Sequence, residues 1–153
     1  MEYKFTTGRF PVKASDCGKY FENIQERFGE IKPEYLVEKA RDESNLLHGC
    51  FEWNDTAAAE KYRVVQAKTL IRTLVKVEQI GDKEITTRAV VSVTFSDAEP
   101  RSYYMADIVM KDEYARDRLL KDAYRDCQYF KDKYSTLIEL QSVFEAIDNL
   151  KII

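Results

Sequence analysis

Residues 39–73 read KARDESNLLHGCFEWNDTAAAEKYRVVQAKTLIRT, and this stretch decides the fold more than any other. It holds the only histidine and the only tryptophan of the chain, and after Trp53 it changes to a helical pattern. Asn54 or Asp55 is a suitable N-cap, because its side-chain oxygen can accept from a free backbone N–H of the first turn. The stretch therefore predicts an aromatic connection with a single turn, then a long helix over residues 55–74. Its inward-facing residues are Val64, Ala67, Leu70, Ile71 and Leu74.

Two shorter helices are predicted before this stretch. From Ser15, a candidate N-cap, apolar residues recur at helical spacing until Gly29 ends the run, which predicts a helix over residues 15–28. Pro33 suits the first position of a second helix, which we expect to end near Asp42. Residues 3–12 alternate loosely around a Thr-Thr-Gly turn and predict a short strand or arm.

Strands are predicted directly after the long helix. Residues 74–80 alternate, Gly81 and Asp82 can form a turn, and residues 85–95 alternate again, which predicts a β-hairpin. A third strand is expected at residues 101–105.

The rest of the chain has a helical pattern, in two segments that begin near Lys111 and at Ser135. We therefore expect an α+β fold with N-terminal helices, a small antiparallel sheet and a C-terminal helical hairpin. The chain is predicted to be a single domain over 1–153, with a helix and hairpin part at 1–106 and a C-terminal helical part at 107–153. Three helices followed by a hairpin is the order of a winged helix-turn-helix, and the alternative is three helices packed on one face of a sheet.

Composition indicates an ordinary folded protein without a membrane span. The chain has 153 residues, 44% hydrophobic and 33% charged, and its apolar runs are only a few residues long. The N-terminus lacks the apolar run of a signal peptide, and three widely spaced cysteines are typical of reduced thiols. We therefore expect a cytoplasmic protein.

The net charge of −3 argues against indiscriminate coating of nucleic acid, but it hides a local excess of positive charge. Between Asp55 and Lys76 there are five basic residues and two acidic ones, a local net charge of +3. On a continuous helix, several of these cations would align around Val65 as one basic stripe, which could track a phosphate backbone. The alternative is a solvated helix face opposite the core. The candidate nucleic-acid-binding residues are Thr56, Lys61, Arg63, Lys68, Arg72 and Lys76.

His48, Phe51 and Trp53 form an aromatic cluster in the connection before the long helix. Such a cluster can anchor a protein partner in a pocket or stack on a base. The alternative is that the three side chains cap the core, with the Trp nitrogen and one imidazole nitrogen hydrogen-bonded to backbone. Both interpretations stay open at the level of sequence.

No catalytic residues, metal site or cofactor are predicted, and we expect the protein not to be an enzyme. One histidine cannot complete a triad, and no nucleophile elbow, phosphate-binding loop or HExxH motif occurs. The pair His48 and Cys50 is a very weak metal signal, because a tetrahedral site needs further ligands. The carboxylates of residues 111–133 interleave with lysines and arginines, as in helix-surface ion pairs.

The pattern ARDESNLLHGCFEWNDTAAAEKYRVVQAKTLIR at residues 40–72, with RAVVSV at 88–93 and KYSTLIELQSVFEAID at 133–148, resembles a small, uncharacterised protein family of bacteriophages and prophages. The resemblance covers nearly the whole chain. This chain has Leu46 where that pattern has a proline before Leu47. The resemblance implies a phage origin and a role in genome handling, regulation or counter-defence, and it carries over no catalytic residue.

Two functions follow as hypotheses. The first is a nucleic-acid-binding regulatory or accessory protein that contacts double-stranded DNA through the long helix. The second is a protein-binding module that inhibits a host enzyme or defence system and uses the acidic net charge and the tyrosine-rich C-terminal part. The apolar positions of the C-terminal helices exceed what a small sheet can cover and predict a homodimer. The alternative is that these helices fold back over the sheet within one chain.

Overall fold

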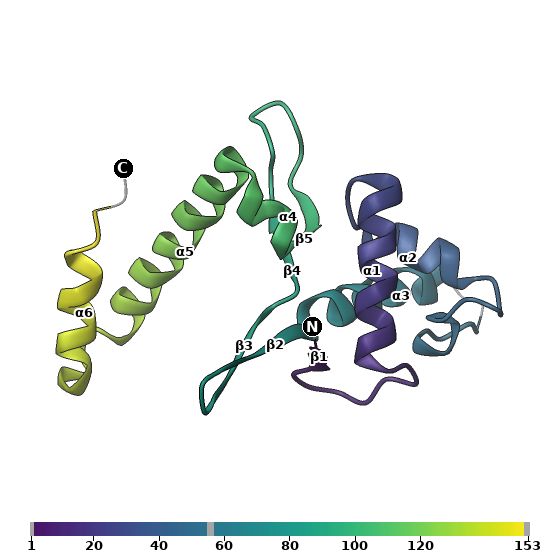
Figure 1. Cartoon of the computed structure of the whole chain (residues 1–153), viewed down its shortest axis with the longest axis horizontal. Coiled ribbons are helices and arrows are strands. Elements are labelled where there is room, and N and C mark those ends of the chain that lie inside the picture. The colour runs from purple at the N-terminus through teal and green to yellow at the C-terminus, as the bar shows by residue number, and fades with distance from the viewer. Residues whose placement is uncertain (1, 55–56, 152–153) are drawn as a thin grey trace.

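The computed structural model of the chain describes residues 2–54 and 57–151 and has an α+β architecture. Figure 1 shows an elongated molecule with α1, α2 and α3 at one end, the strands in the middle and α5 and α6 at the other end. The elements, in chain order, are β1 (Glu2–Phe5), α1 (Ala14–Phe28), α2 (Pro33–Ala40), the 3₁₀ turn η1 (His48–Cys50), α3 (Ala57–Thr73), β2 (Leu74–Ile80), β3 (Lys83–Arg88), β4 (Val90–Val93), β5 (Ser102–Met105), α4 (Ala106–Lys111), α5 (Glu113–Tyr134), the 3₁₀ turn η2 (Ile138–Leu140) and α6 (Gln141–Asp148).

The first two helices form where the sequence predicts them. Helix α1 ends at Gly29, whose positive φ of 77° is the left-handed conformation that glycine adopts without steric cost. Pro33 occupies the first position of α2. The prediction of Ser15 as the N-cap of α1 is wrong, because the helix begins at Ala14 and Lys13 precedes it without a side-chain cap.

The main core lies between α1, α2, α3 and the strand β1. Each of the three helices presents one apolar face to the other two, and the inward-facing residues predicted for α3 are buried or packed against this core. Its most completely buried members are Cys17, Phe21, Ile31, Leu36, Ala40, Leu47, Ala67, Leu70, Ile71, Leu74 and Ala89.

Three strands form an antiparallel sheet in the order β1-β2-β3. Strand β2 follows α3 without a loop, and Ile80 pairs with Lys83 across a turn in which Gly81 has a φ of 61°. The predicted hairpin is confirmed, but its second strand is not continuous over residues 85–95. The strand β3 stops at Arg88, and β4 pairs instead with β5 in a separate two-stranded sheet.

Ala89 lies between the two sheets. Its N–H donates to the carbonyl of Leu74 at 3.2 Å, and its carbonyl accepts from the N–H of Ala106 at 2.9 Å. Two further bonds join the helical end to β5: the Ile31 N–H donates to the Tyr103 carbonyl at 2.7 Å, and the buried Gln25 accepts from the Met105 N–H at 3.0 Å. The β4–β5 sheet is therefore attached to the main core through backbone hydrogen bonds and one bond to the Gln25 side chain.

The C-terminal hairpin consists of α5 and α6. Asp112 caps α5 by accepting from the Ala115 N–H at 2.8 Å, and it separates α5 from the short α4. The predicted helix start at Ser135 is wrong, since η2 intervenes and α6 begins at Gln141.

Helices α5 and α6 extend away from α1–α3 and do not fold back over the three-stranded sheet (Figure 1). In α5 and α6 the described buried residues are Ala115, Phe144 and Ile147. Apolar side chains therefore stay exposed along and beside this hairpin. They are Leu120, Tyr129, Phe130, Leu137, Ile138, Val143 and Leu150.

Candidate functional site

Helix α3 has one buried face and one exposed face, and the exposed face carries part of the predicted basic stripe. Lys61 and Arg72 are exposed and Lys68 is half-buried, while Tyr62 and Val65 beside them are exposed. None of the three cations forms an ion pair with a residue in 2–54 or 57–151. We call Lys61, Lys68 and Arg72 the α3 cation face.

Arg63 does not belong to this face, so its prediction as a nucleic-acid contact is wrong. Its side chain is 2% exposed, and its Nε donates to the carbonyl of Glu52 at 2.5 Å. A second nitrogen donates to the Glu60 carboxylate at 2.9 Å. The guanidinium lies 4.8 Å from the ring centroid of Trp53, a cation–π distance. Arg63 therefore holds the connection before α3 onto the helix.

Lys76 also leaves the predicted stripe. Helix α3 ends at Thr73, and Lys76 lies on strand β2 with only 3% of its side chain exposed. Its ammonium group is paired with the carboxylate of Asp107 on α4. The helical spacing that aligned residue 76 with residues 61, 68 and 72 ends before it is reached, so Lys76 links the three-stranded sheet to α4. Thr56, also predicted as a contact, lies outside the described residues.

The aromatic cluster of His48, Phe51 and Trp53 has the contacts that a core cap requires. The Trp53 indole N–H donates to the His48 carbonyl at 2.8 Å, and His48 Nδ1 lies 2.7 Å from the carbonyl oxygen of Ala40, where it acts as a donor. The two rings stack with centroids 5.0 Å apart and an interplanar angle of 10°. Phe51 is buried and lies against Trp53. The structure thus places the predicted partner-binding residues in intramolecular contacts.

Glu60 connects this cluster to α2. Its carboxylate accepts from Arg63 and, at 2.7 Å, from Arg41, which also pairs with Glu38. The hydrogen bond from Arg63, followed by that from Arg41, lowers the pKa of Glu60 below its ordinary value. Glu60 therefore stays ionised, and Arg41 and Arg63 compensate its negative charge.

A groove beside α3 brings further cations close to Lys68. One pocket of about 310 Å³ is lined by Lys68 together with Lys32 and Arg101, and the adjoining pocket of about 320 Å³ shares Arg101 and contains Arg88. Arg101 is held in place by the Asp122 carboxylate at 2.5 Å and the Ser92 carbonyl at 2.6 Å. The sequence did not indicate this grouping, because the cations come from separate elements and share no spacing.

Two observations concern metal ligands and thiols among the described residues. No three His, Cys, Asp or Glu side chains within 2–54 and 57–151 gather as a group that could hold a metal ion. Burial raises the pKa of the Cys50 thiol to about 11, which disfavours the thiolate that a nucleophile requires. Among the helices of these ranges, none is long and apolar enough to cross a bilayer.

The α3 cation face is thus the described surface on which predicted contact residues remain accessible. Comparison with known proteins adds no relative to this picture: no protein-family model, no curated protein and no solved structure matches the chain.

Proposed function

We propose that the protein is a non-catalytic nucleic-acid-binding protein that contacts double-stranded DNA with the α3 cation face. The observation that carries the proposal is that some cations of this region are paired within the fold and others are not. Arg63 and Lys76 are buried in bonds to their own chain, whereas Lys61, Lys68 and Arg72 point outward without an acidic partner among the described residues.

The spacing of the three cations suits a phosphate backbone. At 100° per residue they fall within about 40° of one another around the helix. From residue 61 to residue 72 the helix rises about 16 Å, which spans several phosphates of one strand. Tyr62 lies beside the cations, is exposed and can donate to phosphate or sugar oxygens, whereas the Thr69 hydroxyl already donates to the Val65 carbonyl.

The groove beside Lys68 adds little net positive charge. Its lining contains the cations Lys32, Arg88 and Arg101 and also the carboxylates of Glu34, Asp122 and Asp126, and Lys32 is paired with Glu30. We therefore leave the principal role in phosphate contact to the α3 cation face.

The test is DNA binding measured by fluorescence anisotropy across a salt series. With three phosphate contacts, log K should fall against log salt with a slope of about −3. The variant Lys68→Glu with Arg72→Glu should lose most of the affinity and keep its thermal stability, because both side chains lie on the outer side of α3.

A matched control variant separates the effect of the α3 cation face from the effect of the net charge of the protein. Lys13→Glu with Lys19→Glu makes the same change of net charge at and just before the start of α1, where both residues are exposed. This variant should bind DNA with a much smaller loss. Equal losses in the two variants would show that only overall charge matters, and unchanged binding by the α3 variant would remove the proposed site.

A second candidate function is a protein-binding module that inhibits a host enzyme or defence system. The observation in its favour is the exposed apolar surface of the C-terminal hairpin, where Ile138 is 81% and Tyr129 is 71% exposed. The same surface supports a homodimer that presents two α3 helices to a symmetric DNA site. Light scattering over a range of concentrations checks the dimer, and a constant monomer mass near 17.9 kDa would discard it.

The resemblance to the phage and prophage family suggests the biological setting of this protein. It supports a role in genome handling, regulation or counter-defence in the cytoplasm of the host cell. If the α3 variant loses DNA binding and also causes a defect in phage growth, the α3 cation face has a role in the phage life cycle.

A further inference from the structure

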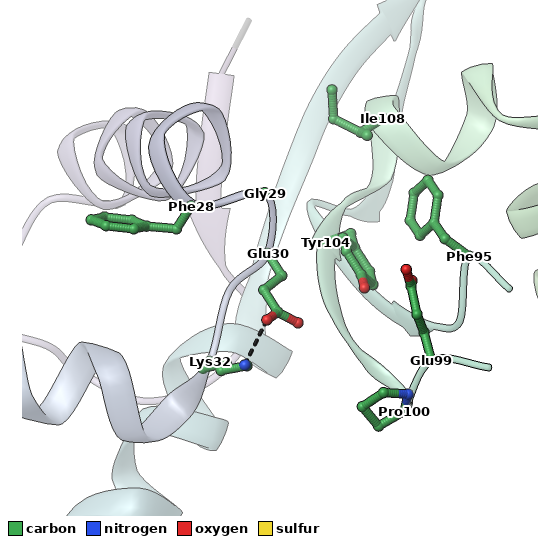
Figure 2. Close-up of a pocket in the computed structure, with 9 residues that line it drawn as sticks. All are labelled: Phe28, Gly29, Glu30, Lys32, Phe95, Glu99, Pro100, Tyr104 and Ile108. Atoms are coloured by element: carbon green, nitrogen blue, oxygen red, sulfur yellow. Dashed lines mark ion pairs between the residues drawn. The ribbon is translucent and has the colours of Figure 1, made fainter.

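A further pocket, of about 530 Å³, lies between the α1–α2 connection and the β4–β5 hairpin (Figure 2). Glu30 and Lys32 enter it from the connection, and Phe95, Glu99 and Tyr104 enter it from the β4–β5 side. The hydrogen bond from the Ile31 N–H to the Tyr103 carbonyl joins the two segments that supply these side chains. The pocket differs from the α3 cation face in its residues and in the sign of its charge.

Tyr104 supplies an unused polar group to this pocket. Its side chain is only 7% exposed, and its ring packs against Phe95 with centroids 4.5 Å apart. Its hydroxyl makes no hydrogen bond with any residue in 2–54 or 57–151, and it is not among the buried atoms without a partner, so the oxygen is open to the pocket. A ligand in the pocket can therefore hydrogen-bond to the Tyr104 hydroxyl in place of water.

The charge around that hydroxyl is negative. Figure 2 shows the Glu30 and Glu99 carboxylates on the two sides of Tyr104. Glu30 is paired with Lys32 at 2.6 Å, whereas Glu99 forms no ion pair within the described ranges. Burial raises the pKa of Tyr104 above its ordinary value, and the two carboxylates raise it further. The field that keeps the phenol protonated also attracts a cation and repels phosphate.

We propose that this pocket receives an arginine side chain from a protein partner. A planar guanidinium offers several N–H donors, which suits the Glu99 carboxylate and the Tyr104 hydroxyl together. Its flat face can lie against the Phe95 ring, and its methylene stem against Ile108. A lysine ammonium lacks the planar face and is more strongly hydrated, so it satisfies these groups less well. The inference does not rest on DNA binding by α3.

The experiment uses the full chain and three capped tripeptides, Gly-X-Gly, in which X is arginine, lysine or citrulline. Citrulline has the shape of arginine without its charge. Amide chemical shifts of residues 28–32 and 95–104 in NMR spectra report binding at the pocket. The arginine peptide should bind with a millimolar dissociation constant, and the citrulline peptide should bind at least about tenfold more weakly.

Three variants locate the interaction. Glu99→Gln should weaken the arginine peptide about tenfold, because it removes the charge and keeps the shape. Tyr104→Phe should weaken it severalfold and leave the melting temperature unchanged or higher, because the lost hydroxyl has no partner in the described chain. Glu78→Gln, an exposed glutamate on β2, is the matched control and should change nothing.

Several results would overturn the proposal. They are equal binding of the arginine and citrulline peptides, equal binding of the arginine and lysine peptides, an unchanged affinity in Glu99→Gln, or no shift at these residues up to about 20 mM peptide. DNA affinity should be the same in Glu99→Gln as in the parent protein. A failure at this pocket is therefore distinct from a failure of the α3 cation face.

Discussion

The two ends of this chain are packed very differently. At the N-terminal end, α1, α2 and α3 enclose a continuous apolar core, and the fold there buries even the cationic side chains of Arg63 and Lys76. At the other end, α5 packs against α4, β4 and α6 and does not join the main core, and most apolar residues of α5 and α6 stay at least partly exposed. Both ends have an amphipathic helical sequence. The difference teaches that such a pattern specifies a helix without specifying what covers its apolar face.

The contrast predicts that stability resides in the N-terminal helices. Phe21→Ala should give the largest effect, a loss of about 3–5 kcal/mol in the free energy of unfolding, because a fully buried ring is replaced by a cavity. Urea denaturation followed by circular dichroism measures it. A loss below about 1 kcal/mol would contradict the assignment of the main core to these helices.

Trp53→Ala tests the edge of that core. Because the ring is half-buried between its contacts with His48, Phe51 and Arg63, we expect a loss of about 2–3 kcal/mol. Trp53→Phe should recover part of the loss, since it keeps an aromatic ring and removes only the bond to the His48 carbonyl. Thermal melts that do not change in the alanine variant would instead favour Trp53 as a partner anchor.

Alkaline pH should weaken the N-terminal core through its buried thiol. Burial raises the pKa of Cys17 to about 12, so the folded state keeps a proton that the unfolded state releases above pH 9. The contribution of Cys17 to stability is therefore fully present well below pH 9 and falls as pH rises from about 9 to about 12, and about 1 kcal/mol is lost by about pH 9.5. Cys17→Ala should show a shallower decline over the same range, and an identical decline would exclude this thiol as the cause.

The smallest effect is expected in the C-terminal hairpin. Phe144 is buried against Phe130, but the hairpin adds little to the main core. Phe144→Ala should therefore change the main unfolding transition by less than about 1 kcal/mol, while the amides of α6 exchange faster with solvent. Hydrogen exchange measured by mass spectrometry reports both. A large loss in the main transition would show that the two ends unfold as one unit.

Local patterns in the sequence predict much of the secondary structure. Gly29 and Pro33 mark a helix end and a helix start that the structure confirms, and the two-residue turn at Gly81 and Asp82 connects β2 and β3 as predicted. These signals are short-range. A left-handed residue, a fixed proline φ or a tight turn acts on its own neighbours and needs no knowledge of the rest of the chain.

The predictions from sequence are wrong where a contact with a distant part of the chain determines the structure. The predicted strand over residues 74–80 already contains Lys76, so its place in the basic stripe holds only if the helix continues past Thr73. The helix ends at Thr73, and pairing with β1 and β3 makes Lys76 part of a strand. Residues 85–95 alternate throughout, so nothing local shows that the strand changes partner at Ala89. Arg63 is buried because the carbonyl of Glu52 and the ring of Trp53 lie over it, which spacing on α3 alone does not reveal.

The same limit applies to the candidate sites. The α3 cation face was predictable because its residues lie on one helix at one spacing. The groove cations and the Tyr104 pocket were not, because their residues come from separate elements that meet only in the folded chain. Grouping of this kind becomes visible only when the backbone path is known.

The position of Ala89 has a mechanical consequence. One backbone unit donates to Leu74 at the start of β2 and accepts from Ala106 at the start of α4, so it joins the bases of the two hairpins. If the chain is stretched between its ends, load passes from Leu74 through Ala89 to Ala106 and bypasses both hairpins. The two bonds at Ala89 share this load with the Ile31–Tyr103 and Gln25–Met105 bonds. Ala89→Pro, which removes the donor, should therefore lower the force at which the α3 end separates from the arm carrying α5 and α6.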